Sequence, residues 1–218
     1  MIISVTNLKG GVGKTTLTTN LAVAFQMRGY KVCIVDTDLG QKSSMEWSGN
    51  RDESLPRLPV FGIGIKQLNK EVEALEADYN IVFIDGSPQL SELADRTILC
   101  SDIVLIPVLP GIYDFRAFEN FLTRYEQVKG LKEAQGAEIK AFVILNRYLE
   151  KSNVSKEIKE ALEEYEVKIM DAKIASRVAY IDTATNGMGV LEYKDPKAKA
   201  EISQIADELE EAIKGFNV

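Results

Sequence analysis

Histidine is absent from the 218-residue chain, and cysteine occurs only twice, as Cys33 and Cys100. The first absence removes the most common metal ligand and the usual acid–base side chain. Two isolated cysteines, with no Cys-x-x-Cys pair, argue against a metallocluster protein and against a disulfide scaffold. We therefore expect a protein of a reducing compartment whose chemistry uses other side chains.

Long hydrophobic runs and an excess of positive charge are also absent. No stretch approaches the roughly 18 consecutive apolar residues of a membrane span, and the chain begins with a strand-like segment instead of a signal peptide's charged start. These features predict a cytoplasmic protein. The net charge is -7, so any contact with DNA must come from a local patch or from assembly. A hydrophobic content of 45% is enough for one substantial core, and we expect residues 1–218 to form a single domain.

The most informative stretch is residues 8–16, Leu-Lys-Gly-Gly-Val-Gly-Lys-Thr-Thr, which follows the apolar run 1–5. Its glycines allow a tight turn that points successive N–H groups at phosphate oxygens, and a helix beginning near Gly13 favours the same anion. Lys14 is placed to reach the β- and γ-phosphates, and the Thr15 hydroxyl to ligate Mg²⁺. The pattern predicts a nucleotide-binding loop with these residues: Lys9, Gly10, Gly11, Val12, Gly13, Lys14, Thr15 and Thr16.

A strict P-loop would have glycine at position 8, where this chain has Leu8 followed by a second lysine, Lys9. This combination resembles the deviant Walker A loop of the ParA/MinD branch of P-loop ATPases. The resemblance extends through residues 107–115 and 174–193, and it is nearest to the short, plasmid-type ParA partition ATPases. It implies that Lys9 reaches across an ATP-bound homodimer to the other subunit's nucleotide, as an arginine finger does in trans. The alternative is a solvated loop lysine.

Aspartates follow two of the buried strand-like runs. Asp85 ends the run Ile-Val-Phe-Ile-Asp and fits the Walker B role of holding Mg²⁺; otherwise it is a strand-end residue that caps a turn. Asp36 ends the run 31–36, where ligands bind in open α/β sheets. The expected metal set is therefore Thr15, Asp36 and Asp85, in part through water.

Two short segments after these strands resemble the family's switches. The first is commonly Asp-x-Asp-Pro-Gln, and here Leu39 and Gly40 replace the proline. The resemblance implies that Asp38 orients the attacking water, so that Lys9, Lys14 and Asp38 are the expected catalytic residues. The second switch is expected at Gly86 to Pro88.

A further pair follows the strand-like run 139–145. Asn146 resembles the family residue that hydrogen-bonds adenine, and Arg147 is expected to stack nearby. Asparagine after a strand is also a common turn residue, which leaves a second interpretation open.

Strand-like and helical patterns alternate along the chain without repeats. The expected strands are 1–5, 31–36, 60–63, 81–85, 103–108, 139–145 and 167–170. The expected helices are 17–28, 43–47, 66–77, 90–99, 114–128, 154–165, 178–185 and 197–214. This order predicts an α/β fold, a doubly wound, mostly parallel sheet with helices on both faces, as in P-loop NTPases.

The resemblance implies an ATPase for plasmid or chromosome partition that uses ATP and Mg²⁺. Its ATP-bound homodimer would bind nonspecific DNA, and a ParB-like centromere-binding partner would stimulate hydrolysis and release. Positive side chains for phosphate contacts occur late in the chain, but acidic residues are interspersed, so a solvated surface of mixed charge is an open alternative. They are Lys173, Arg177, Lys194, Lys197 and Lys199.

Three other functions fit the sequence less well. A MinD-like membrane-cycling ATPase needs a basic amphipathic helix at the end of the chain, whereas the last helix here is acidic, and we expect no membrane contact. Small-molecule kinases or ligases of similar fold would leave Lys9 unexplained. A non-catalytic nucleotide-binding module is hard to reconcile with Lys9, Lys14, Asp38 and Asp85 all being present.

Overall fold

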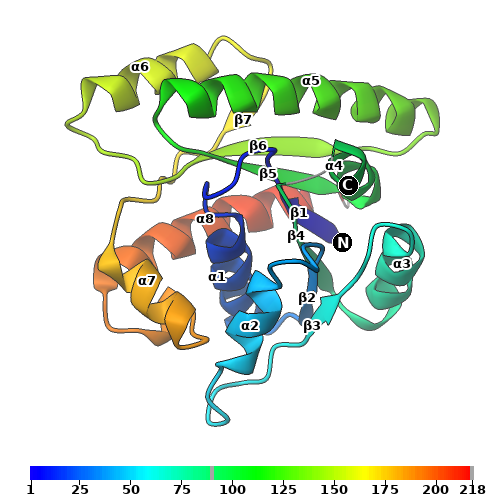
Figure 1. Ribbon diagram of the computed structural model, residues 1–218, viewed down its shortest axis with the longest axis vertical. Helices are drawn as coiled ribbons and strands as arrows, with labels where there is room; N and C mark the ends of the chain where they lie inside the picture. Colours follow the sequence, from blue (N-terminus) through cyan, green and yellow to red (C-terminus); the bar gives the residue numbers. More distant parts are fainter. Residues whose placement is uncertain (89–90, 217–218) are drawn as a thin grey trace.

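The computed structural model describes residues 1–88 and 91–216. Its strands are β1 (Ile2–Val5), β2 (Val32–Asp36), β3 (Val60–Gly62), β4 (Ile81–Asp85), β5 (Ile103–Val108), β6 (Lys140–Leu145) and β7 (Lys168–Ile169). Its helices are α1 (Lys14–Met27), α2 (Ser43–Gly49), α3 (Leu68–Asp78), α4 (Ser91–Cys100), α5 (Ile112–Ala134), α6 (Asn153–Leu162), α7 (Val178–Thr185) and α8 (Pro196–Lys214), with a 3₁₀ turn at Val190–Glu192. Figure 1 shows the sheet between two layers of helices.

The strands form one sheet in the order β3-β2-β4-β1-β5-β6-β7, and every pairing among the described strands is parallel. The predicted doubly wound α/β fold is confirmed. β1 lies in the middle, with Val5 opposite Asp85 on one side and Leu105 on the other. The direction of winding reverses next to β1, which makes its carboxyl end the usual ligand site of such a sheet.

Alternate side chains of the strands supply separate cores on the two faces. Ile3 and Val5 face the layer of α1, α7 and α8, whereas Val104 and Ile106 face α5 and α6. Ile2 belongs to a third cluster under α3 and α4. Because β1 is buried on both faces, the loop that follows it has a rigid base.

The described helix boundaries lie within three residues of the expected ones, except at the end of α5. α5 continues to Ala134, past the expected end at residue 128. The reason is tertiary: Lys132 is buried and donates from Nζ to the Ser101 carbonyl, which holds the last turns although Gly130 favours an end there. The expected start of the fourth helix at residue 90 lies outside the described residues, and α4 begins at Ser91.

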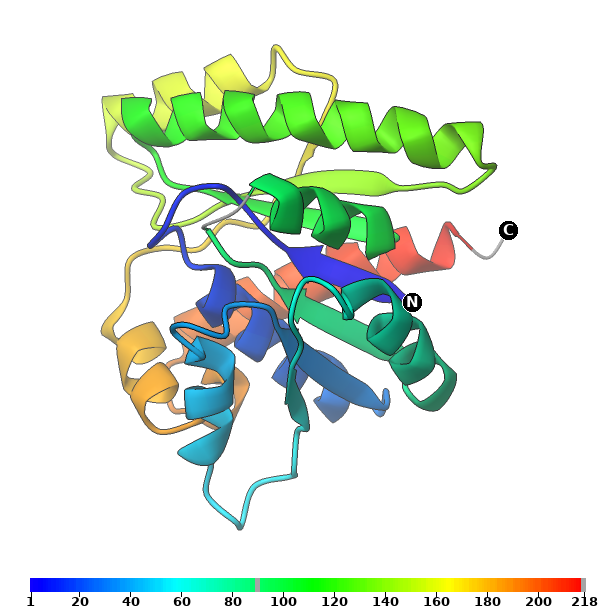
Figure 2. The same ribbon diagram turned by 45° about the vertical axis from the view of Figure 1, so that its right-hand side comes forward.

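The carboxyl ends of the strands share one edge of the molecule, and α2, α7 and the loop after β1 lie there (Figure 2). The N-terminus lies at the opposite edge. The sheet topology thus brings together the segments that follow β1, β2, β4 and β6, which are the segments in which site residues are expected.

Candidate functional site

The loop after β1 is shaped by two glycines in the left-handed region. Gly11 has φ +75° and Gly13 has φ +95°, conformations that side chains with a Cβ rarely adopt. A Cβ on Gly13 would also lie 2.2 Å from Nδ2 of Asn146. That amide donates to the carbonyl oxygen of Val12 at 2.7 Å, so β6 braces the loop from behind.

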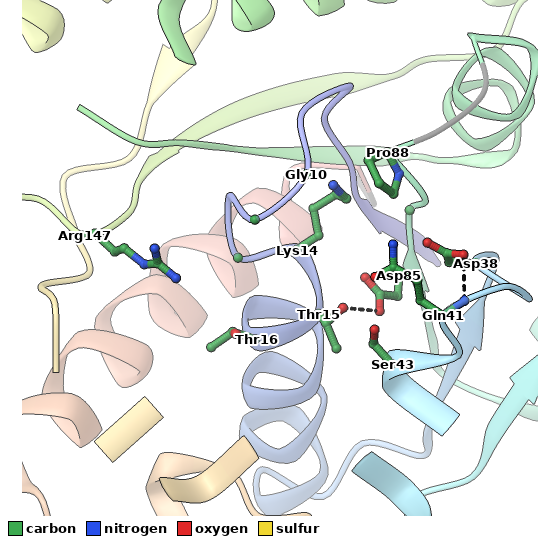
Figure 3. A pocket seen from close by; sticks show the side chains of 13 residues that line it. Gly10, Lys14, Thr15, Thr16, Asp38, Gln41, Ser43, Asp85, Pro88 and Arg147 are labelled. Carbon is green, nitrogen blue, oxygen red and sulfur yellow. Dashed lines mark hydrogen bonds between the residues drawn. The ribbon is translucent and has the colours of Figure 1, made fainter. Parts of the chain in front are cut away.

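This loop forms one wall of a cavity of about 300 Å³ at the carboxyl ends of β1, β2 and β4. Figure 3 shows Arg147 at the end of the cavity away from Asp38. The lining residues are Gly10, Gly11, Gly13, Lys14, Thr15, Thr16, Asp38, Gln41, Ser43, Asp85, Gly86, Pro88 and Arg147. Most of the residues expected in the nucleotide, metal and switch sets therefore meet around one cavity.

Lys14 lies in the buried part of this site. Its Nζ donates to the carbonyl oxygen of Lys9 at 2.8 Å. Burial lowers the pKa of Lys14 to about 8, and the carboxylates of Asp85 and Asp38 oppose that shift only in part. A buried cation with few charged partners is suited to an anionic ligand, since phosphate oxygens would restore the interactions lost with water.

Asp85 faces Lys14 across the cavity (Figure 3). Its Oδ2 accepts hydrogen bonds from the hydroxyls of Thr15 at 2.7 Å and Ser44 at 2.6 Å. Its Oδ1 is buried and has no hydrogen-bond partner among the described residues. Burial raises the pKa of Asp85 to about 7, although the two hydroxyl donors oppose that rise.

The donors at this point fit Mg²⁺, which binds through hard oxygen ligands and keeps several waters. The orphaned Asp85 Oδ1 and the adjacent Thr15 hydroxyl are the groups that would hold it. Asp36 is not among the residues that line this cavity, and its expected role as a metal ligand stays a prediction. Its Oδ1 accepts the amide N–H of Asp38, and its Oδ2 those of Ser44 and Met45, so Asp36 holds the backbone of the first switch in place. Burial raises the pKa of Asp36.

Thr37 joins the two expected switch segments. Its hydroxyl donates to the carbonyl oxygen of Asp85 at 2.8 Å and accepts the N–H of Ser87 at 3.1 Å. Asp38 points to its own turn, where Oδ1 accepts the N–H of Gln41. Gly86 is required by packing, because a Cβ there would lie 2.6 Å from Oγ1 of Thr6.

Lys9 lies on the outer side of the loop and is not among the residues that line this cavity. Its Nζ forms an ion pair with Oδ1 of Asp114 at 2.8 Å, and the two side chains are 33% and 12% exposed. Asp114 is in the first turn of α5. The second lysine of the loop is therefore held within its own chain.

A second cavity, of about 500 Å³, adjoins the first, and Gly13, Thr16 and Arg147 line both. Tyr180 and Ile181 of α7 contribute to its far wall. Asn146 lines this cavity as well as bracing the loop, and Arg147 has a left-handed φ of +51° that arginine rarely adopts. The pair thus lies where the two cavities meet.

The five basic residues expected to contact DNA are spread over the segment that contains α7 and the start of α8. Arg177 is paired with Glu201, which reduces the positive charge that it offers. Lys173 and Lys194 lie over the rings of Tyr148 and Tyr193, and Lys197 and Lys199 are in the first turn of α8. A DNA-binding role for this set stays a prediction.

Three residues of the site carried no recognisable signal in the sequence: Ser44, Thr37 and Asp114. The length of the loop before Ser44 decides which hydroxyl reaches Asp85, and a sequence pattern does not contain that distance. Thr37 lies between two aspartates and belongs to no motif of its own. The resemblance of residues 107–115 included Asp114, but nothing in the pattern paired it with Lys9.

Comparison with known proteins agrees with this geometry. Residues 3–190 match the family model described as the CobQ/CobB/MinD/ParA nucleotide binding domain. The chain belongs to this family. The predicted membership of the ParA/MinD group is confirmed.

Relatives in the family include proteins with different cargoes. The maintenance of carboxysome distribution protein A of Halothiobacillus neapolitanus is 26% identical over 216 residues, 95% of each chain. The chromosome partitioning protein ParA of Caulobacter vibrioides is 24% identical over 233 residues, covering 88% of this chain and 86% of its own. The solved structure of the septum site-determining protein MinD from Pyrococcus horikoshii OT3, complexed with Mg-ADP, has the same fold, with a TM-score of 0.73 at 22% identity over 100% of this chain and 98% of that one.

Proposed function

We propose that this protein is a Mg²⁺-dependent ATPase that hydrolyses ATP to ADP and phosphate and dimerises when ATP is bound. One observation carries the proposal: Lys14, Thr15, Asp38 and Asp85 surround the same cavity at the switch point of the sheet. Phosphoryl transfer requires these parts, namely a phosphate cradle, a metal ligand set and a group that positions water.

In this mechanism the backbone of the loop and Lys14 bind the β- and γ-phosphates. Thr15 and Asp85 would hold Mg²⁺, which when bound neutralises charge on the phosphate oxygens. Asp38 accepts a hydrogen bond from the attacking water and orients it. The adenosine would extend into the second cavity, beside Asn146 and Arg147.

The dimer, its DNA and its partner extend the proposal further. Lys9 would leave Asp114 and contact the nucleotide of the second subunit, which adds positive charge where negative charge develops in the transition state. As the resemblance to partition ATPases implies, the dimer would bind nonspecific DNA, and a ParB-like protein would stimulate hydrolysis and release it. The likeness to a chromosome partitioning protein supports this part of the proposal. A nucleoid-associated location in the cytoplasm would follow from the DNA binding.

Sedimentation velocity with ATP and Mg²⁺ tests the proposal directly. Wild type and Lys9→Ala are compared with and without nonspecific duplex DNA at low salt. We expect an ATP-dependent dimer of the wild type that sediments with DNA, and a monomer for Lys9→Ala. A wild type that remains monomeric with ATP bound would contradict the dimer and favour a small-molecule enzyme.

A second candidate function is the positioning of another cargo on a protein scaffold. The likeness to the carboxysome distribution protein supports it. A membrane scaffold has less support, since α8 packs its apolar side on the core: Ile202, Ile205 and Leu209 are fully buried. No helix in residues 1–88 and 91–216 is long and apolar enough to cross a bilayer. A wild-type dimer that ignores DNA in the sedimentation experiment would favour the protein scaffold.

A further inference from the structure

The short helix α2 is attached to the candidate metal site at its amino-terminal end. The backbone amides of Ser44 and Met45 donate to Oδ2 of Asp36 at 3.0 and 3.2 Å. The Ser44 hydroxyl donates to Asp85 at 2.6 Å. The first turn of this helix is therefore bonded to two carboxylates of the site.

The opposite end of α2 is attached to a distant part of the chain, residues 186–193, which we call the late turn. The indole Nε1 of Trp47 donates to the carbonyl oxygen of Met188 at 3.1 Å. Just after the helix, Arg51 donates to the carbonyl oxygen of Gly187 at 2.8 Å and forms a two-point ion pair with Glu192 at 2.5 and 2.9 Å. The side chains of this pair are 5% and 8% exposed, so it is a buried ion pair.

The late turn fits closely against α2 and α1. Gly187 has φ +62°, and a Cβ on it would lie 2.4 Å from the backbone nitrogen of Arg51. A Cβ on Gly189 would lie 2.9 Å from Val23 of α1. A side chain at position 187 would displace the backbone at Arg51, and a side chain at position 189 would displace Val23.

Asn20 connects the late turn to the nucleotide site. Its Oδ1 accepts the N–H of Val190 at 2.7 Å, and its Nδ2 donates to the carbonyl oxygen of Thr16 at 2.7 Å. The late turn is thus held by the same helix that begins with Lys14. α2 therefore connects the candidate metal site, at its first turn, with this anchored turn, at its other end.

We propose that Arg51 and Glu192 are positioning residues for the ATPase reaction: they hold α2 on the late turn, and α2 holds Asp38 and Ser44 at the site. The inference rests on the proposed function. A helix of seven residues is unstable by itself and depends on its contacts. The loop that carries Asp38 runs from Asp36 to α2, so its course depends on where α2 lies, whereas Lys14 and Thr15 are held by α1 and Asn146.

Loss of the ion pair therefore has an unequal effect on binding and turnover. Leaving Glu192 buried without its partner loosens the end of α2 from the late turn, which Asn20 still holds on α1. The phosphate loop keeps its supports, so we expect nucleotide affinity to change little while turnover falls. A general loss of folding would lower both together.

The test compares Arg51→Gln, Arg51→Lys and the matched control Arg28→Gln, which breaks ion pairs between α1 and α8 with Asp207 and Glu210. We expect kcat of Arg51→Gln to fall about tenfold or more, with the Kd for ADP within about threefold of wild type. Arg51→Lys keeps the charge but not the forked geometry, and should recover part of kcat. Arg28→Gln should match wild type in both. Wild-type kcat in folded Arg51→Gln, or a parallel loss of kcat and ADP affinity, would overturn the proposal.

Trp47 is the chain's single tryptophan and reports on α2 without any turnover. Its ring lies 5.4 Å from the guanidinium of Arg51 and is almost fully buried. In the wild type we expect Mg²⁺ added to the ADP-bound protein to change its emission, because the metal would bind Asp85, which accepts the Ser44 hydroxyl. In Arg51→Gln, or in Glu192→Gln if that variant does not fold, acrylamide quenching should increase and the response to Mg²⁺ should weaken. If the Trp47 emission of the wild type does not respond to Mg²⁺, the proposed positioning role of Arg51 and Glu192 is overturned. If the emission responds but the wild type does not hydrolyse ATP, only the proposed ATPase activity is refuted.

Discussion

The ammonium group of Lys9 lies 2.8 Å from a carboxylate oxygen of Asp114, so one chain by itself neutralises the lysine that sets its loop apart from other P-loops. In the proposed dimer this lysine acts on the other subunit. The ion pair with Asp114 is then a contact that the monomer gives up on dimerisation.

Asp114→Asn should therefore strengthen the ATP-dependent dimer. A partly exposed ion pair contributes about 1 kcal/mol or less, and 1.4 kcal/mol is tenfold in affinity, so we expect an improvement of about two- to fivefold for each of the two pairs that the dimer gives up. Sedimentation over a concentration series with Mg²⁺ and ATP measures it. Asp95→Asn, which breaks the Arg124 pair between α4 and α5, is the control and should have no effect. A weaker dimer in Asp114→Asn would mean that the carboxylate itself contributes to the interface.

Lys14→Ala should abolish ATP binding. The buried ammonium is the only lysine among the described residues that line the phosphate cavity, and charge-assisted bonds to phosphate are strong. We expect at least a 100-fold weaker Kd in a calorimetric titration, with Lys31→Ala unchanged. Near-normal affinity in Lys14→Ala would remove the assignment of the loop as a phosphate cradle.

Asp38→Ala should bind ATP and dimerise but turn over poorly. Positioning and general-base assistance contribute about 10²–10⁴-fold in rate, so kcat should fall about 100-fold or more. Steady-state phosphate release measures it, and Asp52→Ala, outside the residues that line the cavity, is the control. Unimpaired turnover would place the water-orienting role on another residue.

Asn146→Ala separates two roles for this asparagine. If it acts by bracing Val12, its loss weakens every ligand of the loop alike, and one neutral hydrogen bond corresponds to about three- to tenfold. Titrations with ATP, GTP and tripolyphosphate would then show equal losses. A loss confined to ATP would favour the adenine contact that the family resemblance implies.

The stability of the ligand-free protein should depend on Asp85. Its pKa is raised to about 7, so between about pH 4 and pH 7 the folded protein keeps a proton that the unfolded chain has released. The free energy of unfolding should therefore decrease as the pH rises through this range. Urea titrations at several pH values measure this slope, which should be smaller in Asp85→Asn. An equal slope in the variant would mean that another buried group, such as Asp36, is responsible.

Sequence patterns were sufficient for the strands and for most of the cavity because both depend on local chemistry. Ile-Val-Phe-Ile-Asp predicts a buried strand with a carboxylate at its end, and Asp85 is found there. Gly13 shows what such patterns cannot predict. The motif predicts its positive φ, but not that Asn146, more than 130 residues later, fills the space that a side chain at position 13 would need.

The remaining features depend on distances that no pattern contains. Ser44 reaches Asp85, Glu192 reaches Arg51 and Asp114 reaches Lys9 only because particular loops and helices have particular lengths. The end of α5 was misplaced for a similar reason, since a buried bond from Lys132 outweighs the local preference of Gly130. Tertiary contacts of this kind override propensity and become visible only in three dimensions.

The place of β1 in the sheet also has a consequence for biosynthesis. β1 and the phosphate loop leave the ribosome before their neighbours β4 and β5, which begin at Ile81 and Ile103. At about 5–20 residues per second, roughly 5 to 20 s of translation separate the loop from the strands that hold it. Until then the nascent chain carries an apolar strand without a partner, and the phosphate loop has no folded base until β5 has been made.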